Sequence, residues 1–262
     1  MFAGCANLEK INDFASNAEN GAAGFETLPV TFQSLCADNC REKDIDSGKL
    51  NPSKCDCTGE HLADSVDFLF YKTINGYLAG LEQLSAGKAT SYNFDSLNDQ
   101  LTNLKVPPAQ AGAYTKLGSI LTKAITDGYR RNKLKTYIKE ANEPLQILLH
   151  YLRSNIGTSL MIKLSVNKSK LENDYLDLLK NSRGNDFEKR KIIEEFYAKE
   201  ADFENRLAEL KAYSALLQTI AQGHQQLTDN VDKPDKKSLE TMLSQYASNI
   251  KDIRSQIQIL EK

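Results

Sequence analysis

The chain contains no tryptophan, and its 262 residues include only six prolines, fourteen glycines and three histidines. No stretch approaches the roughly eighteen consecutive apolar residues that a transmembrane helix requires. So few prolines and glycines favour long helices over a compact catalytic α/β domain. The 33 basic and 35 acidic side chains leave a formal charge of -2, which excludes a general electrostatic attraction to nucleic acid or to an anionic membrane.

The residues that are present show helical periodicity from residue 59 to the end of the chain. Apolar side chains recur at steps of three and four, which is typical of helices with one buried face. The predicted helices span residues 60–86, 95–104, 108–141, 143–182, 186–230 and 235–261. At 141–146 the sequence Ala-Asn-Glu-Pro-Leu-Gln marks a place where the chain either turns or kinks and continues. We therefore expect an all-α fold, with an antiparallel bundle of four to five long helices.

Residues 1–58 differ from the rest because they hold all five cysteines. Short helices are expected at 6–18 and 28–41, a polar linker with glycines at 16–29, and a loop at 44–58. The sequence thus predicts two domains. Residues 1–58 form a cysteine-rich, loop-rich segment that serves as anchor, linker and disulfide-stapled region, and residues 59–262 form the helical bundle domain.

Four of the cysteines lie close together in a polar stretch: Cys36, Cys40, Cys55 and Cys57. One interpretation is two disulfides, which require an oxidising compartment. A bond between Cys55 and Cys57 would close a very small ring, so each of Cys36 and Cys40 is expected to pair with one of Cys55 and Cys57. The alternative is a zinc site, for which the C-x3-C and C-x-C spacings are acceptable but less specific than C-x2-C pairs.

The fifth cysteine has a different setting. The sequence Phe-Ala-Gly-Cys at positions 2–5 resembles the lipobox of bacterial lipoproteins, in which a hydrophobic and two small residues precede the lipidated cysteine. The resemblance covers these four residues only. It implies that Cys5 is the lipidated mature N-terminus and a membrane anchor, and that a signal peptide extends upstream of Met1. Cytoplasmic location, with Met1 as the native start and Cys5 as a free thiol, is the alternative.

A search for catalytic and metal-binding patterns finds none that is specific. The three histidines, His61, His150 and His224, are far apart in sequence, and none belongs to a Glu-x-x-His or zincin motif. His224 and Glu200 fall on the predicted buried row of the 186–230 helix, where a lone polar side chain is more often a hydrogen-bonded core residue than a ligand. We expect no catalytic residues, no metal and no cofactor.

One basic cluster occurs at residues 129–139, where Arg130, Arg131, Lys133, Lys135 and Lys139 alternate with two tyrosines. Such a cluster can contact anionic headgroups or an acidic partner helix. It is also typical of the solvated face of a helix whose other face packs.

The sequence therefore predicts a non-enzymatic helical lipoprotein of the bacterial cell envelope, facing the periplasm or the exterior. Its partners are expected to be the membrane, through the lipid on Cys5, and a protein or a second copy, through its amphipathic helices. Nucleic acid is not an expected partner. Two alternatives stay open: an intracellular adaptor with zinc bound by the four clustered cysteines, and an enzyme whose site lies inside the bundle.

Overall fold

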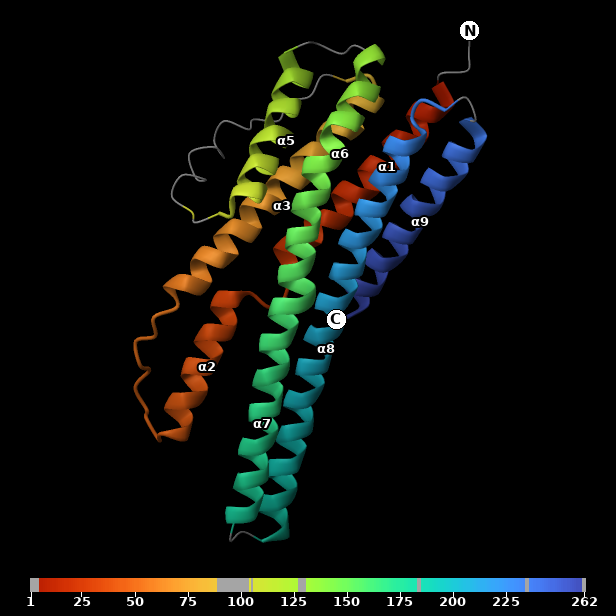
Figure 1. The fold of residues 1–262 in the computed structure, drawn as a ribbon. Helices are drawn as coiled ribbons and strands as arrows, with labels where there is room; N and C mark the ends of the chain where they lie inside the picture. Colours follow the sequence, from red (N-terminus) through yellow and green to blue (C-terminus); the bar gives the residue numbers. More distant parts are fainter. Residues whose placement is uncertain are drawn as a thin grey trace.

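The computed structural model describes residues 5–88, 104, 106–126, 131–182, 185–233 and 236–260. Every regular element within these residues is helical (Figure 1), which confirms the predicted all-α class. The elements are α1 (Cys5–Ala22), η1 (Ala23–Thr27), α2 (Phe32–Asp46), α3 (Thr58–Ser85), α5 (Pro108–Thr126), α6 (Arg131–Ser154), the π-helical turn η2 (Asn155–Leu160), α7 (Met161–Asn181), α8 (Asp186–Asn230) and α9 (Lys236–Leu260). The helix expected at 95–104 lies outside the described residues, apart from Leu104.

Two long rods organise the molecule. Helix α6, the turn η2 and helix α7 follow one another without a gap, and α8 runs back alongside them (Figure 1). Helix α9 packs along the second half of α8, α5 packs on α6, and α1 lies between α3 and α9. The lower part of α7 and the first part of α8 extend beyond the ends of the other helices (Figure 1).

One hydrophobic core joins the helices of the upper body. Helix α3 buries the apolar face that the periodicity predicts, namely Val66, Leu69, Phe70, Ile74, Tyr77, Leu78 and Leu81. The largest fully buried side chains include Phe14 of α1, Phe70 of α3, Tyr114 of α5 and Tyr213 of α8. Burial of such aromatic side chains is the main favourable term that holds helices from distant parts of the chain together.

The linker predicted at residues 16–29 is wrong, since α1 continues to Ala22 and η1 to Thr27. Ala15, Ala18 and Ala22 are buried, so the alanines of this stretch form a close-packed face. Gly21 has the same role, because a Cβ built there would lie 3.0 Å from Cγ2 of Ile250. Alanine and glycine are typical of flexible linkers, but in this stretch their small size allows α1 to pack closely against its neighbours.

The N-terminal segment is consequently less loop-rich than predicted. Three helical elements occupy most of it, and an irregular stretch without helix or strand remains at 49–57. Helix α1 packs extensively on α3 and α9, and Phe14 and Ala15 belong to the same core as the helices after residue 59.

Of the two alternatives at 141–146, a turn or a continuing helix, the structure contains the continuing helix, and the predicted bounds of 108–141 and 143–182 do not hold. Helix α5 ends at Thr126 and α6 begins at Arg131, so that α6 continues through Pro144. A proline inside a helix removes one backbone hydrogen bond and costs about 3 kcal/mol in an exposed helix. The helix nevertheless continues here because Leu145, Leu148 and Leu149 directly after the proline are almost completely buried.

Candidate functional site

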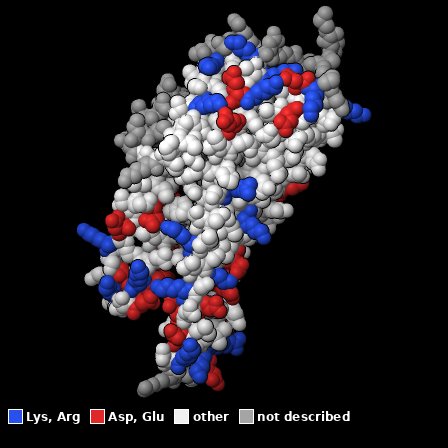
Figure 2. All heavy atoms as spheres, viewed as in Figure 1, with Lys and Arg blue, Asp and Glu red and all other residues white. Residues whose placement is uncertain are grey.

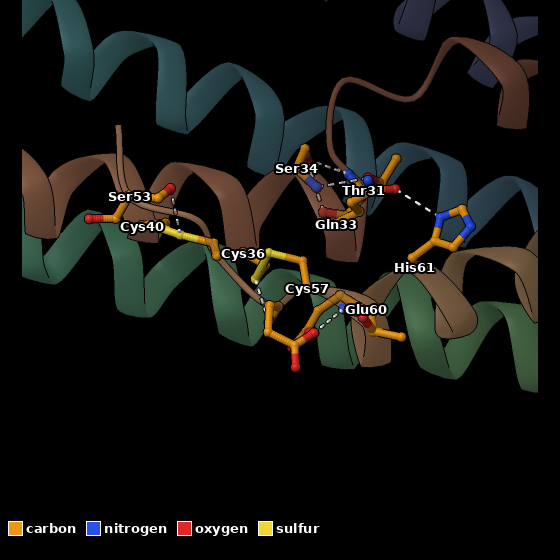
Figure 3. Close-up of a disulfide and its surroundings, with 12 residues drawn as sticks. Thr31, Gln33, Ser34, Cys36, Cys40, Ser53, Cys57, Glu60 and His61 are labelled. Atoms are coloured by element: carbon orange, nitrogen blue, oxygen red, sulfur yellow. Dashed lines mark hydrogen bonds between the residues drawn. A yellow bond between two sulfur atoms is a disulfide. The ribbon is translucent and has the colours of Figure 1, made fainter. Parts of the chain in front are cut away.

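The clustered cysteines lie where α2, the following loop and the start of α3 meet (Figure 3). Cys36 pairs with Cys57 and Cys40 pairs with Cys55, with Cα atoms 5.9 and 6.3 Å apart. Cys36 and Cys40 are one helical turn apart on α2, so both bonds leave the same face of the helix. The pairing is one of the two that the sequence predicts, and it indicates a non-reducing compartment.

Polar side chains hold the ends of the stapled segment. Thr31 and Ser34 form a capping box at the start of α2, and Asp64 of α3 accepts hydrogen bonds from the backbone N–H groups of Phe32 and Gln33 at 2.8 and 2.9 Å. A carboxylate at this position also stabilises the positive end of the helix dipole. The start of α2 is therefore tied to α3 independently of the disulfides.

The loop after α2 is held by Asp44. Its carboxylate accepts hydrogen bonds from the hydroxyl and the backbone N–H of Ser53, both at 2.6 Å. These bonds lower the pKa of Asp44. With the two disulfides, they connect the 49–57 stretch to α2 at three points.

A groove runs beside the disulfides between α2 and α7. Its volume is about 460 Å³, and its walls include Leu35 and Cys40 on one side and Ile162 and Val166 on the other. Ile162 and Val166 are 58% and 61% exposed. Lys163 and Glu60 form an ion pair of 3.4 Å within the wall. The groove is thus partly apolar, with charges of both signs at its edge.

A buried carboxyl group lies at the junction of α3 with the π-helical turn. Asp67 is only 2% exposed, and its Oδ1 accepts a hydrogen bond of 2.7 Å from the amide of Asn155, the first residue of η2. Burial, together with the nearby carboxylate of Asp64, raises the pKa of Asp67 to about 7, although Asn155 opposes the shift. π-helical turns occur frequently at functional sites. The sequence signal for this residue is an acidic side chain inside the apolar face of α3, between Val66 and Leu69.

Replacing this carboxyl group with an amide is expected to stabilise the protein at neutral and higher pH. Below pH 3.8 Asp67 is protonated in both states, but between 3.8 and about 7 only the unfolded chain ionises it, so stability falls as pH rises. Asp67→Asn removes that loss. We expect its free energy of unfolding to exceed that of the wild type by about 4 kcal/mol at pH 8 and to match it near pH 4.

Urea unfolding of both proteins at a series of pH values measures this difference. Asp64→Asn is the matched control, because Asp64 caps α2 as a carboxylate and its loss should destabilise the protein. A constant difference between Asp67→Asn and the wild type over the whole pH range would contradict the assigned protonation of Asp67.

His224 forms the centre of a buried polar network between α3, α6 and α8. Its Nε2 lies 2.7 Å from the hydroxyl of Tyr77, and its Nδ1 lies 3.0 Å from Oδ1 of Asn142. The Asn142 amide donates in turn to Oε1 of Gln225 at 2.7 Å. Since Oδ1 can only accept, Nδ1 of His224 carries the proton and Nε2 accepts from Tyr77. Complete burial lowers the pKa of His224 to about 3 and raises that of Tyr77.

The remaining polar residues discussed from the sequence, His61, His150 and Glu200, do not form a common site. His150 is exposed on α6, and His61 at the start of α3 lies 3.0 Å through Nδ1 from Oε1 of Gln33. Glu200 is only partly buried and forms an ion pair of 3.3 Å with Lys168. Among the described residues, no three or more His, Cys, Asp or Glu side chains are placed to hold a metal ion.

The basic cluster at the start of α6 is partly neutralised. Lys135 and Lys139 both form ion pairs with Asp232, which follows the end of α8. Lys133 is partly buried. Arg130 and the side chain of Arg131 lie outside the part of the chain that the structure describes. Figure 2 shows acidic side chains between the basic ones at this end of the molecule.

Cys5 is the first residue of α1, and its side chain is outside the described set. None of the helices described is long and apolar enough to cross a membrane.

The fold and the cysteine pairs define the chain as an all-α protein with a disulfide-stapled segment near its N-terminus. Comparison with known protein families, with curated proteins and with solved structures finds no match to this chain.

Proposed function

We propose that this chain is a non-enzymatic lipoprotein of the bacterial cell envelope, anchored to the membrane through a lipid on Cys5. In this proposal the long helices form an antiparallel bundle that serves as a binding or scaffolding element outside the cytoplasm. Its partners are the membrane, through the anchor, and a protein or a second copy, through exposed helix faces.

The observation that carries the proposal is the use of the five cysteines. Four of them form the pairs Cys36–Cys57 and Cys40–Cys55, which belong to a non-reducing compartment. The fifth, Cys5, ends the Phe-Ala-Gly-Cys sequence that resembles a lipobox. A lipid on Cys5 and two disulfides together account for every cysteine in the chain.

The position of Cys5 relative to the body supports a short connection to the membrane. Cys5 opens α1, and the same helix carries Ile11 and Phe14 into the core within three turns. A lipid at this position would hold the body close to the bilayer, without the flexible linker that the sequence suggests.

The intact mass of the unreduced protein, purified from its own host, tests the proposal. We expect a chain that begins at Cys5, carries lipid on that residue and contains two disulfides. A Cys5→Ser variant is the matched control: it should keep both disulfides but lose the lipid and fractionate away from membranes. An unmodified Cys5 in a membrane-free protein would contradict the anchor.

The same mass measurement distinguishes the two disulfides from the alternative of a zinc site. A zinc site needs thiolates at Cys36, Cys40, Cys55 and Cys57, whereas the structure pairs these sulfur atoms with each other. Free thiols at these four positions, with bound metal, would contradict the assigned compartment as well.

A further inference from the structure

Exposed apolar side chains are concentrated on one part of the molecule. Twelve large hydrophobic side chains are exposed among the described residues, and seven of them lie between residues 162 and 197, on α7 and the first part of α8: Ile162, Val166, Leu176, Leu178, Phe187, Ile193 and Tyr197. We call residues 162–197 the α7–α8 arm. Figure 1 shows that its lower part extends beyond the ends of the other helices, so only two helices pack together there. A cluster of this kind usually marks an interaction surface.

The outer face of α8 in this arm has a regular pattern. Positions 187, 190, 194, 197 and 201 follow steps of three and four and therefore share one face of the helix. The side chains are Phe187, Arg190, Glu194, Tyr197 and Ala201. Phe187 is 75% exposed and Tyr197 is 62% exposed, which is unusual for aromatic side chains on a monomeric protein. We call this the outer seam.

The side of α8 that faces α7 is distinct from the outer seam. Phe196 is partly buried, and its ring lies 5.6 Å from that of Tyr175 on α7. Position 196 is about 120° or more around the helix from positions 190 and 194. Packing of α7 on α8 therefore leaves the outer seam uncovered.

We propose that the outer seam is a self-association surface, on which a second copy of this chain packs its own α8 in the antiparallel direction. A two-fold axis that passes beside residue 192 places Arg190 opposite Glu194 of the second copy. The same axis places Phe187 opposite Tyr197 of the second copy. Every contact then occurs twice, as a two-fold interface requires.

The charge pattern of the outer seam is complementary to itself, which favours a second copy of this chain as the partner. Lys189, Arg190 and Lys191 form a basic turn, and Glu194 and Glu195 form an acidic turn directly after it. In the single chain, Arg190 donates through Nε to Oε1 of Glu194 at 2.9 Å. Antiparallel pairing places the basic turn of each copy against the acidic turn of the other, whereas a partner of one charge sign would meet repulsion at one of the two turns. Figure 2 shows basic and acidic side chains side by side at this end of the molecule.

The size of the seam sets the strength of association. Aromatic side chains bury roughly 150–250 Å² each, so two of them with their neighbours supply about half of the roughly 800 Å² per partner of a standard interface. We therefore expect a reversible dimer whose population rises with concentration in the micromolar range. The inference is independent of the lipid on Cys5, because the lower part of the arm and the start of α1 lie at opposite ends of the molecule (Figure 1).

Sedimentation velocity of the full chain over a concentration series tests the dimer with charge variants. Arg190→Glu alone and Glu194→Arg alone each place like charges opposite one another twice, and each should raise the dimer dissociation constant by about tenfold or more. The double variant Arg190→Glu/Glu194→Arg exchanges the two charges and should restore dimerisation. A mixture of the two single variants should form a heterodimer, because one copy then presents two acidic and the other two basic side chains.

Lys251→Glu, at an exposed position of α9, is the matched control and should leave the dissociation constant unchanged. Circular dichroism verifies that each variant keeps its helix content. A wild-type chain that stays monomeric up to millimolar concentration would overturn the proposal. So would a dimer that neither single charge variant weakens.

Discussion

Replacing Phe14 with alanine is expected to lower the free energy of unfolding by about 3–5 kcal/mol, the typical cost of removing a buried phenylalanine ring. Phe14 is completely buried, although it belongs to a part of the chain whose composition suggests a linker. The expected loss is large because α1 packs on both α3 and α9, so that a cavity left there has walls from three helices.

The cavity left by Phe14→Ala cannot easily be filled, because its wall includes the backbone of α8 at Gly223. A Cβ built on Gly223 would collide with the ring of Phe14, so the ring lies directly against the α8 backbone. Removal of the ring leaves an empty space beside that backbone, since Gly223 has no side chain that could fill it. The same contact predicts that larger residues at 223 would displace α1.

Thermal or urea unfolding, followed by circular dichroism, measures the effect of Phe14→Ala. Phe68→Ala is the matched control, because Phe68 on α3 is 43% exposed and its truncation should cost less than about 1 kcal/mol. A loss as small as that of the control would show that α1 is not part of the core. Residues 1–58 would then be a separate domain, as the sequence alone predicts.

Acidification is expected to destabilise the protein through His224. This residue has a pKa of about 3 in the folded chain and 6.5 as its ordinary value, because complete burial disfavours the charged form of the ring. Above pH 6.5 the ring is neutral in both states. Between 6.5 and 3 the unfolded chain binds a proton that the folded chain does not, so the stability present above pH 6.5 is lost as pH falls.

His224 alone is expected to lower the free energy of unfolding by about 1.4 kcal/mol for each pH unit below 6.5. Between pH 6.5 and 3 the total loss is about 4–5 kcal/mol. His224→Gln isolates it, because glutamine can hydrogen-bond to Tyr77 and Asn142 but does not titrate. The difference in free energy of unfolding between wild type and His224→Gln should shrink or reverse steadily from pH 6.5 down to 4. Asp67 changes stability with pH in the opposite direction, but it is present in both proteins. Its contribution therefore cancels when the two free energies of unfolding are subtracted.

Denaturant unfolding at half-unit pH intervals provides this curve. Asp67→Asn combined with His224→Gln should show a flatter pH profile than either single variant, because the two groups act in opposite directions. If the wild type and His224→Gln differ by the same amount at pH 7 and pH 4, the ring accepts a proton in the folded state and the assigned network is wrong.

The sequence predicted some features closely because they depend on local chemistry. Helix α8 was expected at 186–230 and lies at Asp186–Asn230, since Asn185 caps it and its side chain accepts from the backbone N–H of Phe187 and Glu188. The three-and-four spacing of apolar residues at 60–86 predicted the buried face of α3. The cysteine spacing excluded one pairing and left two, of which the structure contains one.

Other features depend on contacts between distant residues. The periodic row of the 186–230 helix was predicted as buried, but Ile193 near its start is 37% exposed and full burial begins near Leu210. The row itself has the same spacing throughout. What differs is that α6 and α9 cover the second half of α8, while α7 is the main neighbour of the first part.

By itself, the sequence determined the all-α class, the positions of the best-capped helices and the separation of Cys5 from the four clustered cysteines. These follow from spacing, capping and composition, which act over a few residues. Only the tertiary structure decided that α1 is a core helix, that α6 continues through Pro144, and that Asp67 and His224 are buried with hydrogen-bond partners. Each of these depends on which side chains arrive from elsewhere in the chain, because burial and dielectric environment are properties of the packed helices and not of any one segment.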